Sequence, residues 1–96
     1  IMNNEIISKL KADKQNLFTR FKVTKLGVFG SFARGEETPE SDVDILVEFS
    51  EVPGMIDFFS AEEHLEKLLN RKIDLVRENA IRPELREIVM SEVILL

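Results

Sequence analysis

The chain has 96 residues, of which 44% are hydrophobic and 32% are charged, and its formal net charge is −5. This length suits one domain with a modest hydrophobic core, so a large substrate would have to be held partly by another chain. The acidic balance argues against broad, sequence-independent binding of nucleic acids, which requires basic surface to displace counterions from phosphates.

The first third of the chain predicts a helix, a short strand and a tight turn. Between Asn4 and Phe21, apolar residues recur on one helical stripe that is interrupted around residues 11–14, which predicts one bent helix or two short ones. Leu26 to Phe29 is a short apolar strand ending at Gly30, and the following run SFAR predicts a short helical turn.

The later elements alternate between strands and helices. They are a loop over 35–41, a strand over 43–49, an amphipathic helix over 55–69, a strand over 72–76, a helix from 83 to about 91, and a terminal segment over 93–96 that is either a last strand or a docking surface. This order predicts an α/β (α+β) fold, in which residues 1–96 form one domain with a small mixed sheet flanked by helices.

Several features of the sequence restrict location and metal chemistry. No apolar run is long enough to span a bilayer and no signal peptide is recognisable, so we expect a cytoplasmic protein without membrane contact. The chain contains no cysteine and a single histidine, His64, which we interpret as a solvated surface residue. Any bound metal must therefore be held by oxygen atoms.

Two aspartates, Asp42 and Asp44, lie where a buried strand begins. This position is unexpected, because burying a carboxylate without a partner costs roughly several kcal/mol of folding free energy. Residues i and i+2 of a strand point to the same face, so the two side chains can converge on the same ions. Oxygen-only, carboxylate-rich sites suit Mg²⁺, which completes its coordination with water and substrate phosphates. The sequence thus predicts a phosphate-containing substrate.

Gly30 and Ser31 provide the complementary half of such a site. A glycine at a strand end followed by a serine that opens a helical turn leaves backbone N–H groups and a hydroxyl available to an anion, although a plain turn with Ser31 as helix cap has the same sequence. Arg34 lies one turn further on, where it is either a phosphate ligand or a solvated arginine.

The combined pattern is Gly30-Ser31, ten further residues, Asp42-Val43-Asp44, and Asp74 in a later apolar strand. It resembles the nucleotidyltransferase superfamily related to DNA polymerase beta, and in particular its minimal members, the MNT-domain proteins. The stretches LGVFGSFARGEETPESDVDILVEF, NRKIDLV and IRPELREIVMSEVILL carry this resemblance over nearly the whole chain.

The resemblance implies a role for each matching residue. Gly30 and Ser31 would hold the triphosphate of ATP, Asp42 and Asp44 would bind two Mg²⁺ ions, and Asp74 would complete the metal site and help to deprotonate the attacking hydroxyl. It also implies a partner, because MNT-domain proteins are commonly encoded with a HEPN-domain ribonuclease as a toxin–antitoxin pair.

Two functions follow as alternatives. One is an enzyme that transfers AMP from ATP to a hydroxyl of the partner. The resemblance suggests that this hydroxyl belongs to a tyrosine, and because this sequence contains no tyrosine, we expect the partner to supply it. The other is a binding module, an antitoxin that neutralises the toxin by covering it. The complete Gly-Ser and three-aspartate set favours the enzyme, since a pure binder has no physical need for crowded carboxylates.

Overall fold

The computed structural model describes residues 2–96, and the side chains from residue 5 onward. Four strands form one mixed sheet in the order β3-β2-β1-β4. The strands β1 (Val23–Phe29) and β2 (Val43–Phe49) are antiparallel, β3 (Ile73–Arg77) is parallel to β2, and β4 (Ile94–Leu95) is antiparallel to β1. The expected small mixed sheet flanked by helices is confirmed.

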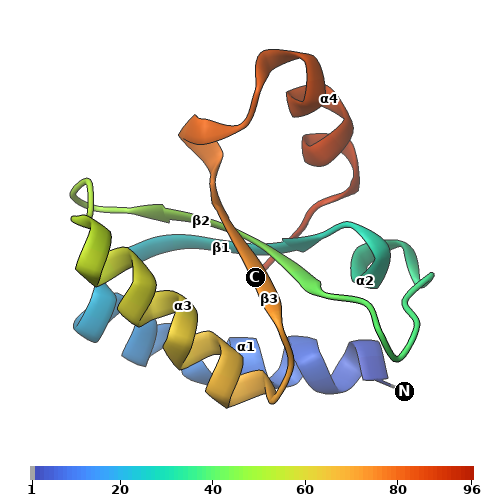
Figure 1. Cartoon of the computed structure of the whole chain (residues 1–96), viewed down its shortest axis with the longest axis horizontal. Helices are drawn as coiled ribbons and strands as arrows, with labels where there is room; N and C mark the ends of the chain where they lie inside the picture. The colour runs from blue at the N-terminus through green and yellow to red at the C-terminus, as the bar shows by residue number, and fades with distance from the viewer. Residues whose placement is uncertain (1) are drawn as a thin grey trace.

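The helices lie on both sides of this sheet (Figure 1). The long helices α1 (Met2–Phe21) and α3 (Met55–Leu69) lie side by side on one face, and α4 (Pro83–Glu92) lies on the other. The short helix α2 (Ser31–Arg34) follows β1, and a single 3-10 turn, η1 (Glu78–Ala80), follows β3.

The bounds of α2, β2 and α3 are those that the sequence predicts, whereas α1, β1, β3 and α4 differ from the prediction. Helix α1 is continuous, so the alternative of two short helices is wrong: its apolar stripe is interrupted at residues 11–14 because that turn faces mostly outward. β1 begins three residues earlier than predicted, because Val23 and Lys25 still pair with Phe49 and Glu48 of β2, across a register shift at Thr24. β3 is displaced by one residue and α4 extends to Glu92.

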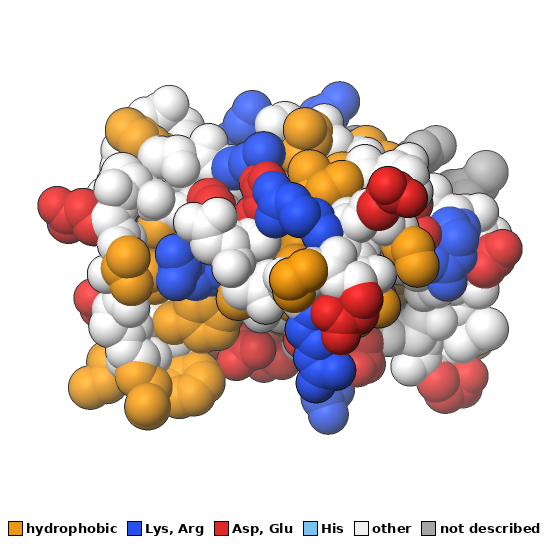
Figure 2. Space-filling view, turned by 90° about the horizontal axis from the view of Figure 1, so that it is seen from above, with side chains coloured by type: hydrophobic (Ala, Val, Ile, Leu, Met, Phe, Trp, Pro, Cys, Tyr) orange, Lys and Arg blue, Asp and Glu red, His pale blue; other side chains and the backbone are white. Residues whose placement is uncertain are grey.

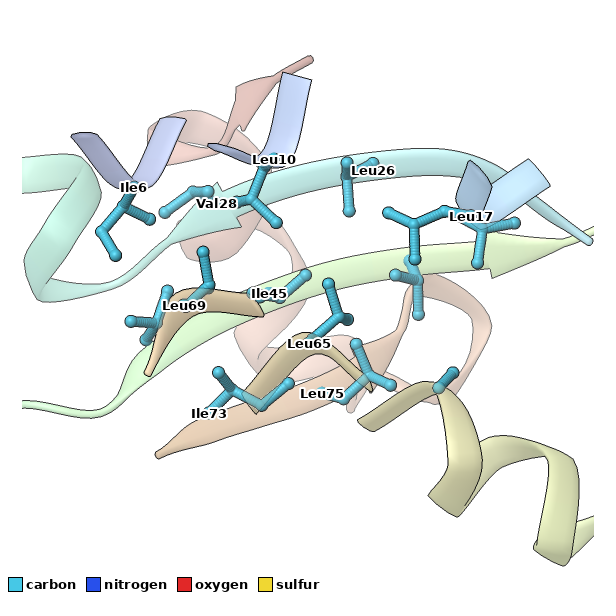
Figure 3. Packing of buried hydrophobic residues seen from close by; sticks show 14 of the residues in the cluster. Ile6, Leu10, Leu17, Leu26, Val28, Ile45, Leu65, Leu69, Ile73 and Leu75 are labelled. Atoms are coloured by element: carbon cyan, nitrogen blue, oxygen red, sulfur yellow. The ribbon is translucent and has the colours of Figure 1, made fainter. Parts of the chain in front are cut away.

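The hydrophobic core lies between the sheet and the pair α1 and α3. Side chains from both helices point toward the strands and fill this layer (Figure 3). Alternate residues of β2, Val43, Ile45 and Val47, are fully buried in it, as expected for a strand with one face on the core. The residues between them, including Asp44, belong to the opposite face.

The C-terminal segment forms the edge of the sheet beside β1. Gly27 leaves room for β4 to cross, because a Cβ atom there would lie 2.8 Å from Cγ2 of Val93. The terminal segment therefore forms a last strand, as one of the two alternatives predicted, while Leu95 and the α4 residues Leu85 and Ile88 stay exposed. Among the described residues, none of the helices combines the length and apolarity needed to traverse a bilayer.

Candidate active site

The turn after β1 brings the backbone of Gly30 into direct contact with the carboxylate of Asp44. Gly30 has φ 74° and ψ −152°, a conformation that is essentially restricted to glycine. A Cβ atom at Gly30 would overlap Oδ2 of Asp44 and lie 3.0 Å from its Cγ. The Gly30 carbonyl accepts the N–H groups of Ala33 and Arg34, both at 3.1 Å, which starts α2 immediately beyond the contact.

The strand register places Asp44 centrally in the candidate site. Asp44 is opposite Phe29, the last residue of β1, and opposite Asp74 of the parallel strand β3. Asp42 directly precedes β2 and is exposed, as is Asp74, whereas Asp44 is half-buried. The structure thus brings Gly30, Asp44 and Asp74 to one end of three neighbouring strands.

Electrostatics reflect this crowding of acidic groups. Partial burial raises the pKa of the Asp44 carboxyl above its ordinary value, and the charges of Asp74, Asp42 and Glu92 raise the pKa further, while Arg34 opposes them. Like charges that are held together favour either a proton or a bound cation. The environment of Asp44 is therefore suited to a positively charged ligand.

The fit of this donor set to Mg²⁺ rests on its chemistry. Within residues 2–96, no three Asp, Glu or His side chains lie close enough, in the conformation seen, to hold a metal ion. The groups that face one another are nonetheless carboxylate oxygens, the donors that Mg²⁺ prefers, and Asp42 and Asp74 both act on Asp44 electrostatically. The donors fit the ion, although the side chains do not form a closed cage.

Glu92, the last residue of α4, is a member of the site that sequence reasoning missed. Its Oε2 accepts the N–H of Gly30 at 2.7 Å, and its Oε1 accepts Nη1 of Arg34 at 3.0 Å. Arg34 also donates from Nε to Glu36 at 2.9 Å, so this exposed arginine is engaged by two carboxylates rather than free in solvent. No local pattern marks Glu92, because its partners lie about 60 residues away.

Arg71 is a second residue that the sequence did not single out. Its Nη2 donates to the carbonyl oxygens of Thr38, Pro39 and Ser41, at 3.3, 3.1 and 2.8 Å, and its guanidinium stacks on Phe32. The loop that leads into Asp42 is therefore anchored from the turn between α3 and β3.

His64 is not the solvated residue that the sequence suggested. It is half-buried, its Nε2 lies 2.7 Å from Oδ2 of Asp13, and its ring packs against Phe21 at 5.2 Å. It joins α3 to α1 on the core side of the sheet and takes no part in the candidate site.

Comparisons with known proteins identify the family of the chain. Residues 7–96 match the sequence family described as nucleotidyltransferase domain. The chain is 46% identical over 90 residues to the protein adenylyltransferase MntA of Thermococcus cleftensis, which covers 94% of this chain and 91% of that protein.

Solved structures show the same fold. A minimal nucleotidyltransferase superposes with a TM-score of 0.83 and 36% identity, covering 98% of this chain and 95% of that one. A second match is a chain from the Shewanella oneidensis complex between a tri-AMPylated HEPN toxin and an MNT antitoxin, with a TM-score of 0.60. The match covers 98% of this chain and 67% of that chain at 21% identity, which is a likeness of fold alone.

A mixed sheet with acidic residues on two adjacent strands beside a glycine turn, together with these matches, defines a nucleotidyltransferase. The chain belongs to the nucleotidyltransferase domain family. Its likeness to the minimal members, predicted from the Gly-Ser and aspartate pattern, is confirmed, as is the expectation of an enzyme.

Proposed function

We propose that this protein is an antitoxin that transfers AMP from ATP to a tyrosine of a HEPN-domain toxin, in a reaction that requires Mg²⁺. The observation that carries the proposal is the contact between Asp44 and the bare Cα of Gly30, with Asp74 opposite in the register. A partly buried carboxylate held this close to the turn, with the charges of two further aspartates acting on it, is accounted for by a bound cation, which a phosphate-containing ligand would accompany.

The residues divide the work as follows. Gly30, Ser31 and Arg34 bind the phosphates of ATP, while Asp42, Asp44 and Asp74 hold the metal ions. Two Mg²⁺ ions, when bound, would neutralise the departing charge and lower the pKa of the attacking hydroxyl. Asp74, which is exposed near the start of β3, accepts the proton of that hydroxyl.

The reaction balances without any further reagent. The phenol oxygen of the tyrosine forms a bond to the α-phosphorus of ATP, the bond from that phosphorus to the β-phosphate oxygen breaks, and pyrophosphate leaves. The phenol proton passes to Asp74 and then to solvent. A phenol suits this step because its pKa of about 10 is far below that of an aliphatic alcohol.

Two similar proteins support the choice of ATP as substrate and of a HEPN-domain toxin as partner. One is a protein adenylyltransferase, and the other structure contains a HEPN toxin that carries AMP groups. The acceptor must come from another chain, since the 96-residue sequence contains no tyrosine.

Intact-mass spectrometry tests the proposal. A candidate HEPN-domain partner is incubated with this protein, ATP and Mg²⁺, and should gain one or more AMP masses. Asp42→Asn and Asp44→Asn should slow the transfer by more than the roughly 10–100-fold that loss of a metal's outer-shell partner costs. Asp57→Asn, the same change at an exposed position of α3, is the matched control and should leave the rate unchanged.

A second candidate, neutralisation by complex formation alone, is favoured by one observation: the carboxylates do not form a closed metal cage among the described residues. The variants above decide between the two. If Asp42→Asn and Asp44→Asn neutralise the toxin as well as the unmodified protein does and no mass is added, the enzymatic proposal is wrong.

A further inference from the structure

The carboxylate of Glu92 occupies donors that the proposed function assigns to ATP. Its two oxygens accept the backbone N–H of Gly30 at 2.7 Å and Nη1 of Arg34 at 3.0 Å. A carboxylate that accepts a backbone N–H and a guanidinium N–H at the same time makes the contacts that a phosphate group makes. Glu92 therefore stands in for a phosphate of the substrate.

We propose that Glu92 is an intramolecular competitor of the triphosphate, which must leave Gly30 and Arg34 before ATP can bind. The inference rests on the proposed function in that Gly30 and Arg34 are taken as phosphate ligands. The two anions exclude each other because one N–H of Gly30 cannot serve both, and because they repel at this distance. Glu92 is half-buried, so solvent screens that repulsion only in part.

Gly30 itself explains why a competitor is useful. It is buried, and a buried N–H without an acceptor destabilises the fold. Glu92 satisfies this group when no nucleotide is present, and a phosphate oxygen satisfies it when nucleotide binds. The exchange replaces one charge-assisted hydrogen bond by another, so the loop never holds an unpaired donor.

Helix α4 is built in a way that permits this exchange. None of its residues is buried, and the face that bears it shows acidic, basic and apolar side chains interspersed (Figure 2). Besides Glu92, Arg86 of this helix forms hydrogen bonds to the 3-10 turn after β3, where it donates to the carbonyl and the carboxylate of Glu78. Release of Glu92 therefore leaves the core between the sheet and the helices α1 and α3 intact.

The competitor also predicts selectivity among anions. A ligand must offer enough negative charge to displace a carboxylate that is already paired with Arg34. A triphosphate that bridges to the metal ions meets this requirement, whereas a single inorganic phosphate competes with Glu92 on nearly equal terms. We expect the site to discriminate against single phosphates.

Calorimetric titration with inorganic tripolyphosphate, and separately with ATP and Mg²⁺, tests the inference. Glu92→Gln keeps the size of the side chain and an oxygen for Gly30 but removes the charge, so it should tighten binding of both ligands roughly three- to tenfold. Glu87→Gln removes a charge of the same sign from an exposed position of the same helix. It should change the affinity for either ligand by less than about twofold, because solvent and salt screen that charge.

The outcomes separate the inference from the function on which it rests. If the unmodified protein binds ATP and Glu92→Gln binds it equally or more weakly, the inference is overturned and the proposed function stands. If neither protein binds either ligand, both are wrong. Should Glu92→Gln fail to fold, NMR of the unmodified protein decides: tripolyphosphate must shift the side-chain carboxyl carbon of Glu92 together with the Gly30 amide, and a Glu92 signal that stays in place refutes displacement.

Discussion

Replacement of Gly30 by alanine tests the geometry of the site most directly. The backbone there has φ 74° and ψ −152°, which a residue with a Cβ adopts only at a cost of about 1–3 kcal/mol. The new methyl group would also overlap Oδ2 of Asp44, so the carboxylate must leave its position. We expect a total loss of about 2–4 kcal/mol in the free energy of unfolding.

The chain provides a matched control at Gly35. This glycine also has a positive φ, 73°, but no atom lies within 4 Å of a Cβ built on it. Gly35→Ala should therefore cost only the left-handed strain of about 1–2 kcal/mol. For a domain of this size each kcal/mol lowers the melting temperature by about 4–8 °C, so calorimetry resolves the two variants.

A double-mutant cycle separates the overlap from the strain. Asp44→Ala removes the atoms that the new methyl group would meet, so Gly30→Ala should cost about 1 kcal/mol less in that background than in the unmodified protein. Equal melting temperatures for Gly30→Ala and Gly35→Ala, or costs that add within about 0.5 kcal/mol in the cycle, would refute the contact between Gly30 and Asp44.

Two further variants test the surroundings of the site. The raised pKa of Asp44 means that the folded protein holds this proton more tightly than the unfolded chain, so the charged carboxylate lowers stability as the pH rises through its pKa. Asp44→Asn should thus raise the free energy of unfolding of the metal-free protein at pH 7 by about 0.2–1 kcal/mol, the usual size of a cross-strand charge interaction. Urea titrations at pH 7 and near pH 3 test this, and the stabilisation should vanish at the lower pH. A variant that is less stable than the unmodified protein at pH 7 contradicts the argument. Arg71→Ala should cost about 1–2 kcal/mol and expose the loop at residues 38–41 to proteolysis, whereas unaltered cleavage would show that the three carbonyl contacts do not hold it.

The parts of this protein that the sequence predicted are those in which signal and structure are local. The helix over residues 55–69 has its full apolar stripe within one segment, and its predicted bounds are those observed. The turn SFAR and the aspartates Asp42 and Asp44 likewise lie in or within a few residues of the strands that position them.

What the sequence could not predict are contacts between distant segments. Glu92 meets Gly30 across 62 positions, His64 meets Asp13 across 51, and Arg71 meets Ser41 across 30. Periodicity indicates that a helix has an inner and an outer face, but it does not indicate which polar residue of one element will meet which group of another. The sequence around His64 therefore indicates a solvated residue, although its partner Asp13 lies on α1.

The spacing of the two aspartates joins the core and the candidate site in a single strand. Val43 and Ile45 are fully buried on the side of α1 and α3, so the residue between them must point to the other face. A slip of one residue in the pairing of β2 would turn Asp44 and Glu48 into the core and its valines toward the opposite face, at the cost of desolvating two carboxylates at once. The hydrophobic face of β2 thus fixes the direction of Asp44 more firmly than any contact within the site. For the same reason, the repulsion at Asp44 can persist without a bound cation, because relieving it by a register shift would cost far more than the repulsion itself.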